Sequence, residues 1–378
     1  MFNTYTLEDD IKRLQYIAEH SSSKSLKSYY NRILIQLSSI LYELTEEYPE
    51  IRITKRNMIF MEKYANNLEK VIKEQVSSKE YTDLVNTLTR NSLKRLKPII
   101  GVYPFKTTIN LSDAKDLIKD FICSYDISLY PIIEKALSDE HLFTINNISR
   151  IGRGYSYFNT YSRNPYIIVY TENNKLNMES LICLVHELGH VIHFYTTGNR
   201  PKNYDRILVD NFIETPSLTF EYFFIDYLIK NDIEFSDTQK ILNNNLHMLK
   251  EYLQYLRVNN QIVDLIVDKD EYEEEELQQM LLSRGTALDI ELIHDYFYKI
   301  QSNYEFSLGG LLAAYYYEQY RKDPEKTKKD FYDFSKCIGV TDNLDMINNF
   351  GINFEKFKQC MYLKDIVDEN QKHLQYKR

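Results

Sequence analysis

Two histidines four residues apart are the first side chains in this sequence whose spacing predicts chemistry. His186 and His190 lie in the pentapeptide His-Glu-Leu-Gly-His, within an apolar stretch, residues 177–197, that we expect to be helical. Residues four apart lie on one face of a helix, so both imidazoles would point toward one spot, which suits a tetrahedral zinc ion. Glu187 follows the first histidine, and from there its carboxylate would act as a general base toward an attacking water.

A zinc site that performs hydrolysis needs a third protein ligand and leaves its fourth position to water. Glu214 is the predicted ligand, because its distance from His190 along the chain leaves room for a turn and a second helix that crosses the first. His193 is the alternative, but three ligands in line along one helix cannot surround an ion, so we expect it to orient the site or to pack beside it. Glu221 is expected either to accept a hydrogen bond from a ligand histidine or to be an ordinary surface carboxylate.

Composition and charge narrow the class of protein. The 378 residues carry a net charge of −9 with no basic stripe, so nucleic acid is not an expected partner. The 4 cysteines are scattered, which argues against a cysteine-based zinc site and fits reduced thiols in a cytosol. No apolar signal core opens the sequence, and no apolar stretch approaches the ~20 residues that span a membrane. We therefore expect a cytoplasmic protein with no membrane partner. The oligomeric state does not follow from the sequence, and a monomer is the preferred expectation.

Helical patterns dominate the elements that must position these residues. Glycine and proline are scarce, at 10 and 8 residues, which favours long helices over a turn-rich β fold. Residues 166–171 are β-branched and aromatic and predict one of few strands. Asn177 is the predicted N-cap of the helix that carries the histidines, and Gly198 its predicted stop. Apolar stripes at helical spacing predict further helices twice within residues 7–48, at about 55–77 and at about 78–97.

The order of motifs resembles the oligoendopeptidase F and thimet oligopeptidase family of zinc metallopeptidases. Gly154-Tyr155-Ser156, then Asn164-Pro165-Tyr166-Ile167, then HELGH and Glu214 follow one another as in oligoendopeptidase F. Segments 303–324 and 340–357 are similar to later family segments, so the resemblance covers about residues 95–364. Many zincins share HELGH, whereas the ordered set is far more specific.

The resemblance implies a mainly α, zincin-type metallopeptidase with a deep substrate groove and a small β-sheet at its edge. Strand 166–171 would edge the groove and bind an extended peptide by β-strand addition. Gly154, Tyr155 and Tyr166 would be substrate-binding residues, with 154–156 either a mobile loop over the peptide or an ordinary connection. One zinc ion per chain and oligopeptide substrates are also implied. The implied division is a short N-terminal helical region, 1–94, a catalytic region, 95–366, and a tail, 367–378.

Two features depart from the family pattern. Only about 94 residues precede the match, fewer than in full-length members, so we expect the roof of the groove to be reduced or missing. In the tyrosine-rich stretch, Phe306 and Ser307 occupy places where another tyrosine is expected. Tyr304 is the preferred donor to the oxyanion, with a role as a core aromatic as the alternative. The other candidates for oxyanion or substrate contacts are His294, Tyr296 and Tyr298.

The function predicted from these residues is a zinc metalloendopeptidase that hydrolyses short oligopeptides, with Glu187 as general base. Two alternatives remain open. One is a catalytically weak or inactive peptide-binding protein, although a binder does not need the intact Glu187. The other is a zinc hydrolase that acts on a modified peptide or a non-peptide amide in a dedicated pathway.

Overall fold

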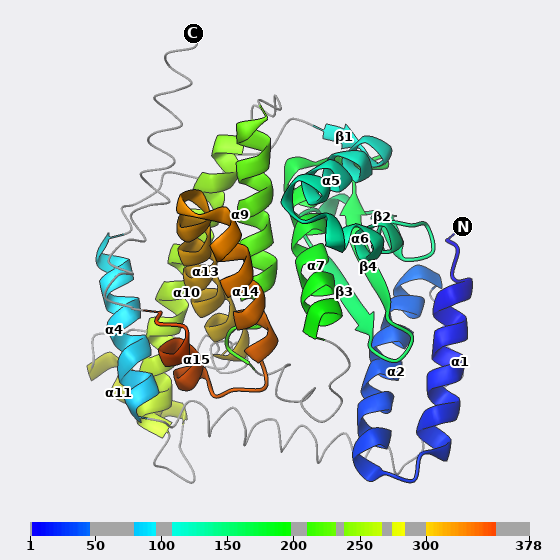
Figure 1. The fold of residues 1–378 in the computed structure, drawn as a ribbon. Coiled ribbons are helices and arrows are strands. Elements are labelled where there is room, and N and C mark those ends of the chain that lie inside the picture. The colour runs from blue at the N-terminus through cyan, green and yellow to red at the C-terminus, as the bar shows by residue number, and fades with distance from the viewer. Residues whose placement is uncertain are drawn as a thin grey trace. The chain divides into compact units, whose positions relative to one another are not determined.

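The protein is described by a computed structural model that covers residues 2–45, 79–95, 108–197, 210–231, 238–266, 274–283 and 300–352 (Figure 1). Contacts divide the chain into two compact units, Met1–Lys63 with Pro104–Tyr204 and Pro216–Ile241, and Tyr64–Tyr103 with Asp205–Thr215 and Leu242–Arg378. The predicted regions 1–94, 95–366 and 367–378 divide the chain differently and stay a prediction. Helices make up most of the described residues, which confirms the mainly α class.

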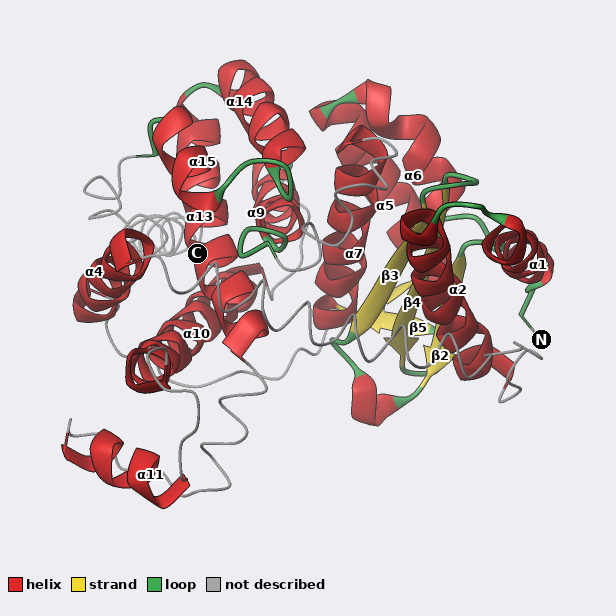
Figure 2. Cartoon of the chain, turned by 90° about the horizontal axis from the view of Figure 1, so that it is seen from below, coloured by secondary structure: helices red, strands yellow, loops and turns green. Residues whose placement is uncertain are grey.

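The first unit holds a three-stranded sheet in the order β2-β4-β3 (Figure 2). Strand β4 (Asn164–Thr171) runs parallel to β2 (Leu142–Asn146) and antiparallel to β3 (Gly154–Asn159). The predicted strand is confirmed, but the predicted addition of a peptide to it is wrong, because β2 and β3 pair with both sides of β4. A second sheet of two strands pairs β1 (Thr108–Asn110) with β5 (Lys175–Asn177).

Residues 154–156 form the start of β3 and are not a loop over the site. Gly154 pairs with Val169 and Tyr155 with Ile168 in regular antiparallel register. Both alternatives that the sequence left open for this segment, a mobile loop or an ordinary connection, are therefore wrong. The backbone here is held by the ladder to β4.

Helix α7 (Met178–Thr197) packs against β3 and β4 and carries the two histidines (Figure 2). The side chain of Asn177 accepts a hydrogen bond from the backbone N–H of Ser180 at 2.8 Å, which confirms the predicted N-cap. Gly198 lies outside the described residues. The helix is buried on most of its surface because the sheet covers one side and α9 (Thr215–Lys230) approaches the other.

The N-terminal helices of the first unit, α1 (Tyr5–His20) and α2 (Lys24–Thr45), pack against each other as a hairpin. Asp10 on α1 ties this hairpin to the sheet, because its Oδ2 accepts hydrogen bonds from Ser162 Oγ at 2.7 Å, Asn164 Nδ2 at 2.8 Å and Tyr166 Oη at 2.7 Å. Asp10 is 3% exposed, so the charge is held by these three donors in a buried setting. The turn between β3 and β4 therefore depends on a residue far away in the sequence.

Asp10→Ala is expected to lower the free energy of unfolding by on the order of 3 kcal/mol, since three donors, of which Tyr166 Oη is buried and the other two part-buried, lose their shared acceptor. Urea unfolding followed by circular dichroism measures the effect. Asp9→Ala is the matched control, because Asp9 is on the same helix and pairs with Arg13 at the surface, where such pairs contribute roughly 0–1 kcal/mol. Equal effects of the two substitutions would contradict the role assigned to Asp10.

Helices α5 (Leu111–Tyr125) and α6 (Tyr130–Ala136) also belong to the first unit. The helices of the second unit are α4 (Lys79–Arg95), α11 (Glu274–Ser283), α13 (Ile300–Lys322), α14 (Pro324–Cys337) and α15 (Asn343–Asn349), while α10 (Thr238–Ile266) lies largely in this unit. The predicted helices within 7–48 and at about 78–97 are confirmed, and the one at about 55–77 falls outside the described residues. Within the described ranges, none of the helices combines the length and apolarity required to cross a membrane.

Candidate metal centre

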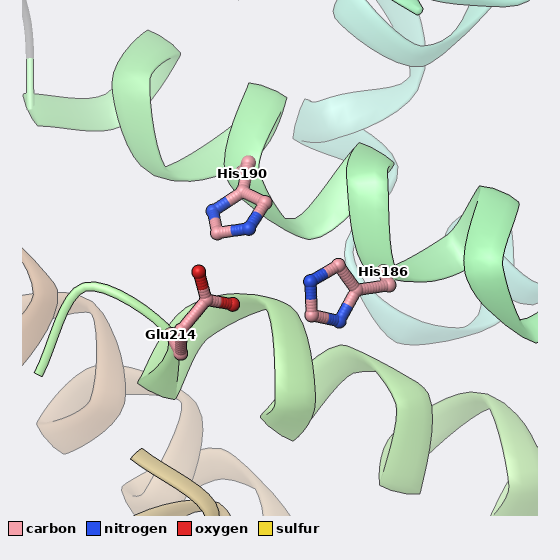
Figure 3. A group of neighbouring side chains, drawn as sticks. All are labelled: His186, His190 and Glu214. Carbon is pink, nitrogen blue, oxygen red and sulfur yellow. The ribbon is translucent and has the colours of Figure 1, made fainter. Parts of the chain in front are cut away.

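His186, His190 and Glu214 form a group of potential metal ligands (Figure 3). One ligand atom from each of these side chains lies within 4.8 Å of the other two. The two imidazoles project from successive turns of α7, and the carboxylate comes from the residue directly before α9. The spacing of the histidines and the choice of Glu214 as their partner thus agree with the geometry.

Gly189 explains how the start of α9 reaches the histidines. A Cβ atom at Gly189 would lie 2.6 Å from Ser217 Cα and 3.2 Å from the carbonyl oxygen of Pro216. Only a residue without a side chain allows the two backbones to approach this closely. Because Glu214 is directly followed by this first turn of α9, Gly189 sets the position from which the carboxylate projects.

Gly189→Ala is expected to lower the free energy of unfolding by about 1–3 kcal/mol and zinc affinity by roughly tenfold, because the added methyl forces α9 away from α7. Urea unfolding and competition with a chromophoric chelator measure the two effects. In an unobstructed helix the same change would stabilise by about 1 kcal/mol. A gain in stability with unchanged zinc affinity would show that the two helices do not meet at Gly189.

Glu221 orients the first histidine. Its Oε1 lies 2.7 Å from His186 Nδ1, and the residue is 7% exposed. The hydrogen bond that the sequence suggested is present, and the surface alternative is wrong, because α9 turns this side chain inward. With Nδ1 engaged, Nε2 is the nitrogen of His186 that remains to bind a metal.

Glu187 lies beside the start of β3. Its side chain is 6% exposed, and a Cβ atom at Gly154 would come within 3.1 Å of Glu187 Cγ and 2.7 Å of Cys183 Sγ. Burial raises the pKa of the Cys183 thiol, and the neighbouring carboxylates raise it further, so this thiol is neutral at physiological pH. Burial likewise raises the pKa of Tyr157, with smaller contributions from Tyr155 and Glu187. Glu187, the candidate general base, is thus buried beside the start of β3.

The remaining predicted residues fall in different places. His193 is 2% exposed, stacks on Phe194 and does not belong to the ligand group. Tyr155 is 43% exposed on β3. Tyr166 is a correction, since it is fully buried and donates to Asp10, which leaves its side chain no access to a substrate.

Tyr304 is 1% exposed on α13, and its hydroxyl donates to the Asn260 side chain. An oxyanion role for Tyr304 stays a prediction. The other three candidates in this stretch, His294, Tyr296 and Tyr298, lie outside the described residues.

Reasoning from the sequence missed Gly189 and Asp10. Gly189 had a usable signal, because a glycine in the middle of an apolar helix costs about 1 kcal/mol against alanine and so suggests a packing reason. Asp10 had none, because its partners in the β3–β4 turn are brought to it only by the fold.

Comparison with known proteins finds a family model whose matched residues include the candidate metal ligands. The model of peptidase family M3 matches residues 143–323, which include both histidines, Glu187, Glu214 and Tyr304. This match covers a little less than half of the chain, so it is a similarity to peptidase family M3. The predicted resemblance is confirmed, and the family M3 region lies inside the stretch on which that resemblance was based.

The chain is also similar to individual proteins, each over a different share of its length. Oligopeptidase PepF of Bacillus subtilis (strain 168) is 28% identical over 146 residues, which cover 38% of this chain but only 20% of that protein. Among solved structures, PZ peptidase A with an inhibitor has a TM-score of 0.51 at 11% identity, over 95% of this chain and 68% of that one. This likeness supports the mainly α fold. A structure assigned to oligoendopeptidase F of Bacillus anthracis str. Ames has a TM-score of 0.48 at 14% identity, over 91% of this chain and 62% of that one.

Proposed function

We propose that this protein is a zinc metalloendopeptidase that hydrolyses peptide bonds in short oligopeptides. The observation that carries the proposal is the convergence of His186, His190 and Glu214, with Glu187 on the same helix as the histidines. The family M3 region and the similarity to an oligopeptidase support peptide hydrolysis as the reaction.

The donor set fits zinc. Two imidazoles and one carboxylate are a ligand set of catalytic zinc sites, which leave a fourth position open. The hydrogen bond from His186 to Glu221 supplies the support that ligand histidines usually have. We infer one zinc ion per chain. When bound, zinc would polarise the scissile carbonyl and lower the pKa of a water molecule toward about 7.

Glu187 is the proposed general base. It accepts the proton of the attacking water and passes it to the leaving amine. Its place next to His186 in the sequence and its burial against the start of β3 support this role, because a confined carboxylate keeps one orientation. Glu221 keeps the His186 ring in place during the reaction.

An extended peptide would add to β3 rather than to β4. In the described sheet, β2 and β3 each pair on one side only, with β4, and of these two it is β3 that begins beside Glu187. Backbone groups on the other side of β3 would then bind the substrate as a further strand, with Gly154 and Tyr155 nearest the site. We also propose that a deep groove, too narrow for folded proteins, surrounds this edge.

The proposed role of Tyr304 has its own test. Tyr304→Phe is expected to reduce kcat about 100- to 1000-fold with little change in KM if the hydroxyl stabilises the oxyanion. Steady-state kinetics on one peptide and urea unfolding would be run together. If the hydroxyl serves only Asn260, the substitution lowers stability and leaves kcat near the parental value.

Cleavage of a mixed library of short peptides, with mass spectrometric detection, tests the function. The protein is assayed as purified, after chelation, and after zinc is restored. Cleavage that disappears with the metal and returns with zinc supports the proposal. Zinc binding with peptide capture but no cleavage would favour the peptide-binding alternative. Failure to bind zinc at all would overturn the proposal.

A further inference from the structure

Asp210 is a buried carboxylate that the proposed chemistry does not use. It is 2% exposed, and each of its oxygens accepts a backbone hydrogen bond: Oδ1 from Phe212 N–H at 2.9 Å and Oδ2 from Gly339 N–H at 2.6 Å. No cation of the described residues pairs with it. A buried carboxylate without a cation is costly, so its presence calls for a specific reason.

The first of these bonds shapes the turn that carries Glu214. The carbonyl of Asp210 accepts from Ile213 N–H at 3.1 Å, and that of Phe212 accepts from Thr215 N–H at 2.9 Å. Together with the bond from Phe212 N–H to the Asp210 side chain, they hold residues 210–215 in one compact turn. Glu214 is the second-last residue of this turn, so its backbone position follows from that of Asp210.

The second bond ties the turn to the end of α14. Gly339 has a φ of +72°, a left-handed conformation that glycine adopts without strain and that aims its N–H at Asp210. Phe212 adds an apolar contact in the same direction, because its ring meets that of Phe334 on α14 edge to face, with centroids 5.7 Å apart.

The other side of the turn is closed by α13. A Cβ atom at Gly309 would lie 3.0 Å from Glu214 Cβ and 3.0 Å from the backbone nitrogen of Thr215. The backbone of Glu214 therefore has α13 directly against it. A displacement of the backbone of residues 210–215 cannot be accommodated by a movement toward α13. It therefore changes the position of the Glu214 side chain.

We propose that Asp210 is a positioning residue for Glu214, which sets zinc affinity by joining the turn of the third ligand to the end of α14. Only a carboxylate supplies two acceptor oxygens to two separate N–H groups, whereas asparagine supplies one oxygen and one NH₂ group. Burial raises the pKa of Asp210 to about 7, the two backbone donors oppose that shift, and nearby Asp342 adds to it. The inference rests on the proposed zinc site.

The test uses the whole protein and compares Asp210→Asn with Asp210→Ala. Zinc affinity is measured by competition with a chromophoric chelator, and ligand geometry by the visible absorption of the cobalt(II)-substituted protein. Asp126→Ala is the matched control, because Asp126 also accepts a backbone N–H two residues on, from Ser128, in a turn of the other unit. Urea unfolding of the metal-free proteins reports stability separately.

Asp210→Asn is expected to weaken zinc binding about 10- to 100-fold and to alter the cobalt spectrum, while Asp126→Ala stays within about twofold of the parent. Asp210→Ala is expected to weaken binding at least as much, and if it does not fold, Asp210→Asn decides. Lower stability with parental zinc affinity and an unchanged cobalt spectrum would overturn the inference and leave the proposed function intact. A parent protein that binds no zinc would overturn both.

Discussion

Glu187→Gln is expected to keep zinc and to reduce kcat/KM about 100- to 10,000-fold, the contribution of a positioned general base. Glutamine has nearly the same shape as glutamate, so the packing against Gly154 is retained while the proton acceptor is lost. The measurement is peptide cleavage at pH 7 with metal analysis of the same samples.

Glu179→Gln is the matched control for this substitution. Glu179 lies on α7 two turns before Glu187 and is exposed, so it tests what the same exchange does elsewhere on the helix. Its variant is expected to keep parental activity. If Glu187→Gln retained activity with zinc bound, another group would have to accept the proton, and the mechanism proposed for Glu187 would be wrong.

Glu214→Ala is expected to weaken zinc binding by about 100-fold or more. A full set of zinc ligands contributes roughly 10–16 kcal/mol, so one ligand of four accounts for about 3 kcal/mol, which is a factor of about 100. Chelator competition measures the affinity, and cleavage is expected to fall in parallel at limiting zinc.

The zinc affinities of two further variants are compared with that of Glu214→Ala. Glu172→Ala removes an exposed carboxylate outside the ligand group and is expected to change nothing. Glu221→Gln is expected to cost about 10- to 100-fold, because it supports His186 without touching the metal. Unchanged metal binding in Glu214→Ala, together with loss of metal in His193→Ala, would move the third ligand to His193.

Properties of single segments could be predicted from the sequence. The helix of the two histidines begins where Asn177 predicts, because a cap is a contact over three residues. The two helices within residues 7–48 and the strand at 166–171 are also present, since apolar periodicity and β-branched composition act locally. The spacing of His186 and His190 was sufficient to place their imidazoles on one face.

The pairing partners of β4 in its sheet could not be predicted from the residues of the strand. The run Tyr166-Ile167-Ile168-Val169-Tyr170 is buried without alternation, which is typical of a strand covered on both faces and paired on both sides. A local pattern does not say which strands are its neighbours. Because β4 pairs with both β2 and β3, the edges of the described sheet lie at residues 142–146 and 154–159.

The sequence by itself predicted the candidate metal-binding group: two histidines on one helical face, a carboxylate next to the first as the proposed base, and a further carboxylate beyond the following turn. Only the tertiary structure decided what supports them. Glu221 meets His186, Gly189 admits α9, and Asp10 holds the β3–β4 turn. The physical reason is that spacing along a helix or strand fixes directions within about two turns, whereas contacts between distant segments depend on how whole faces pack.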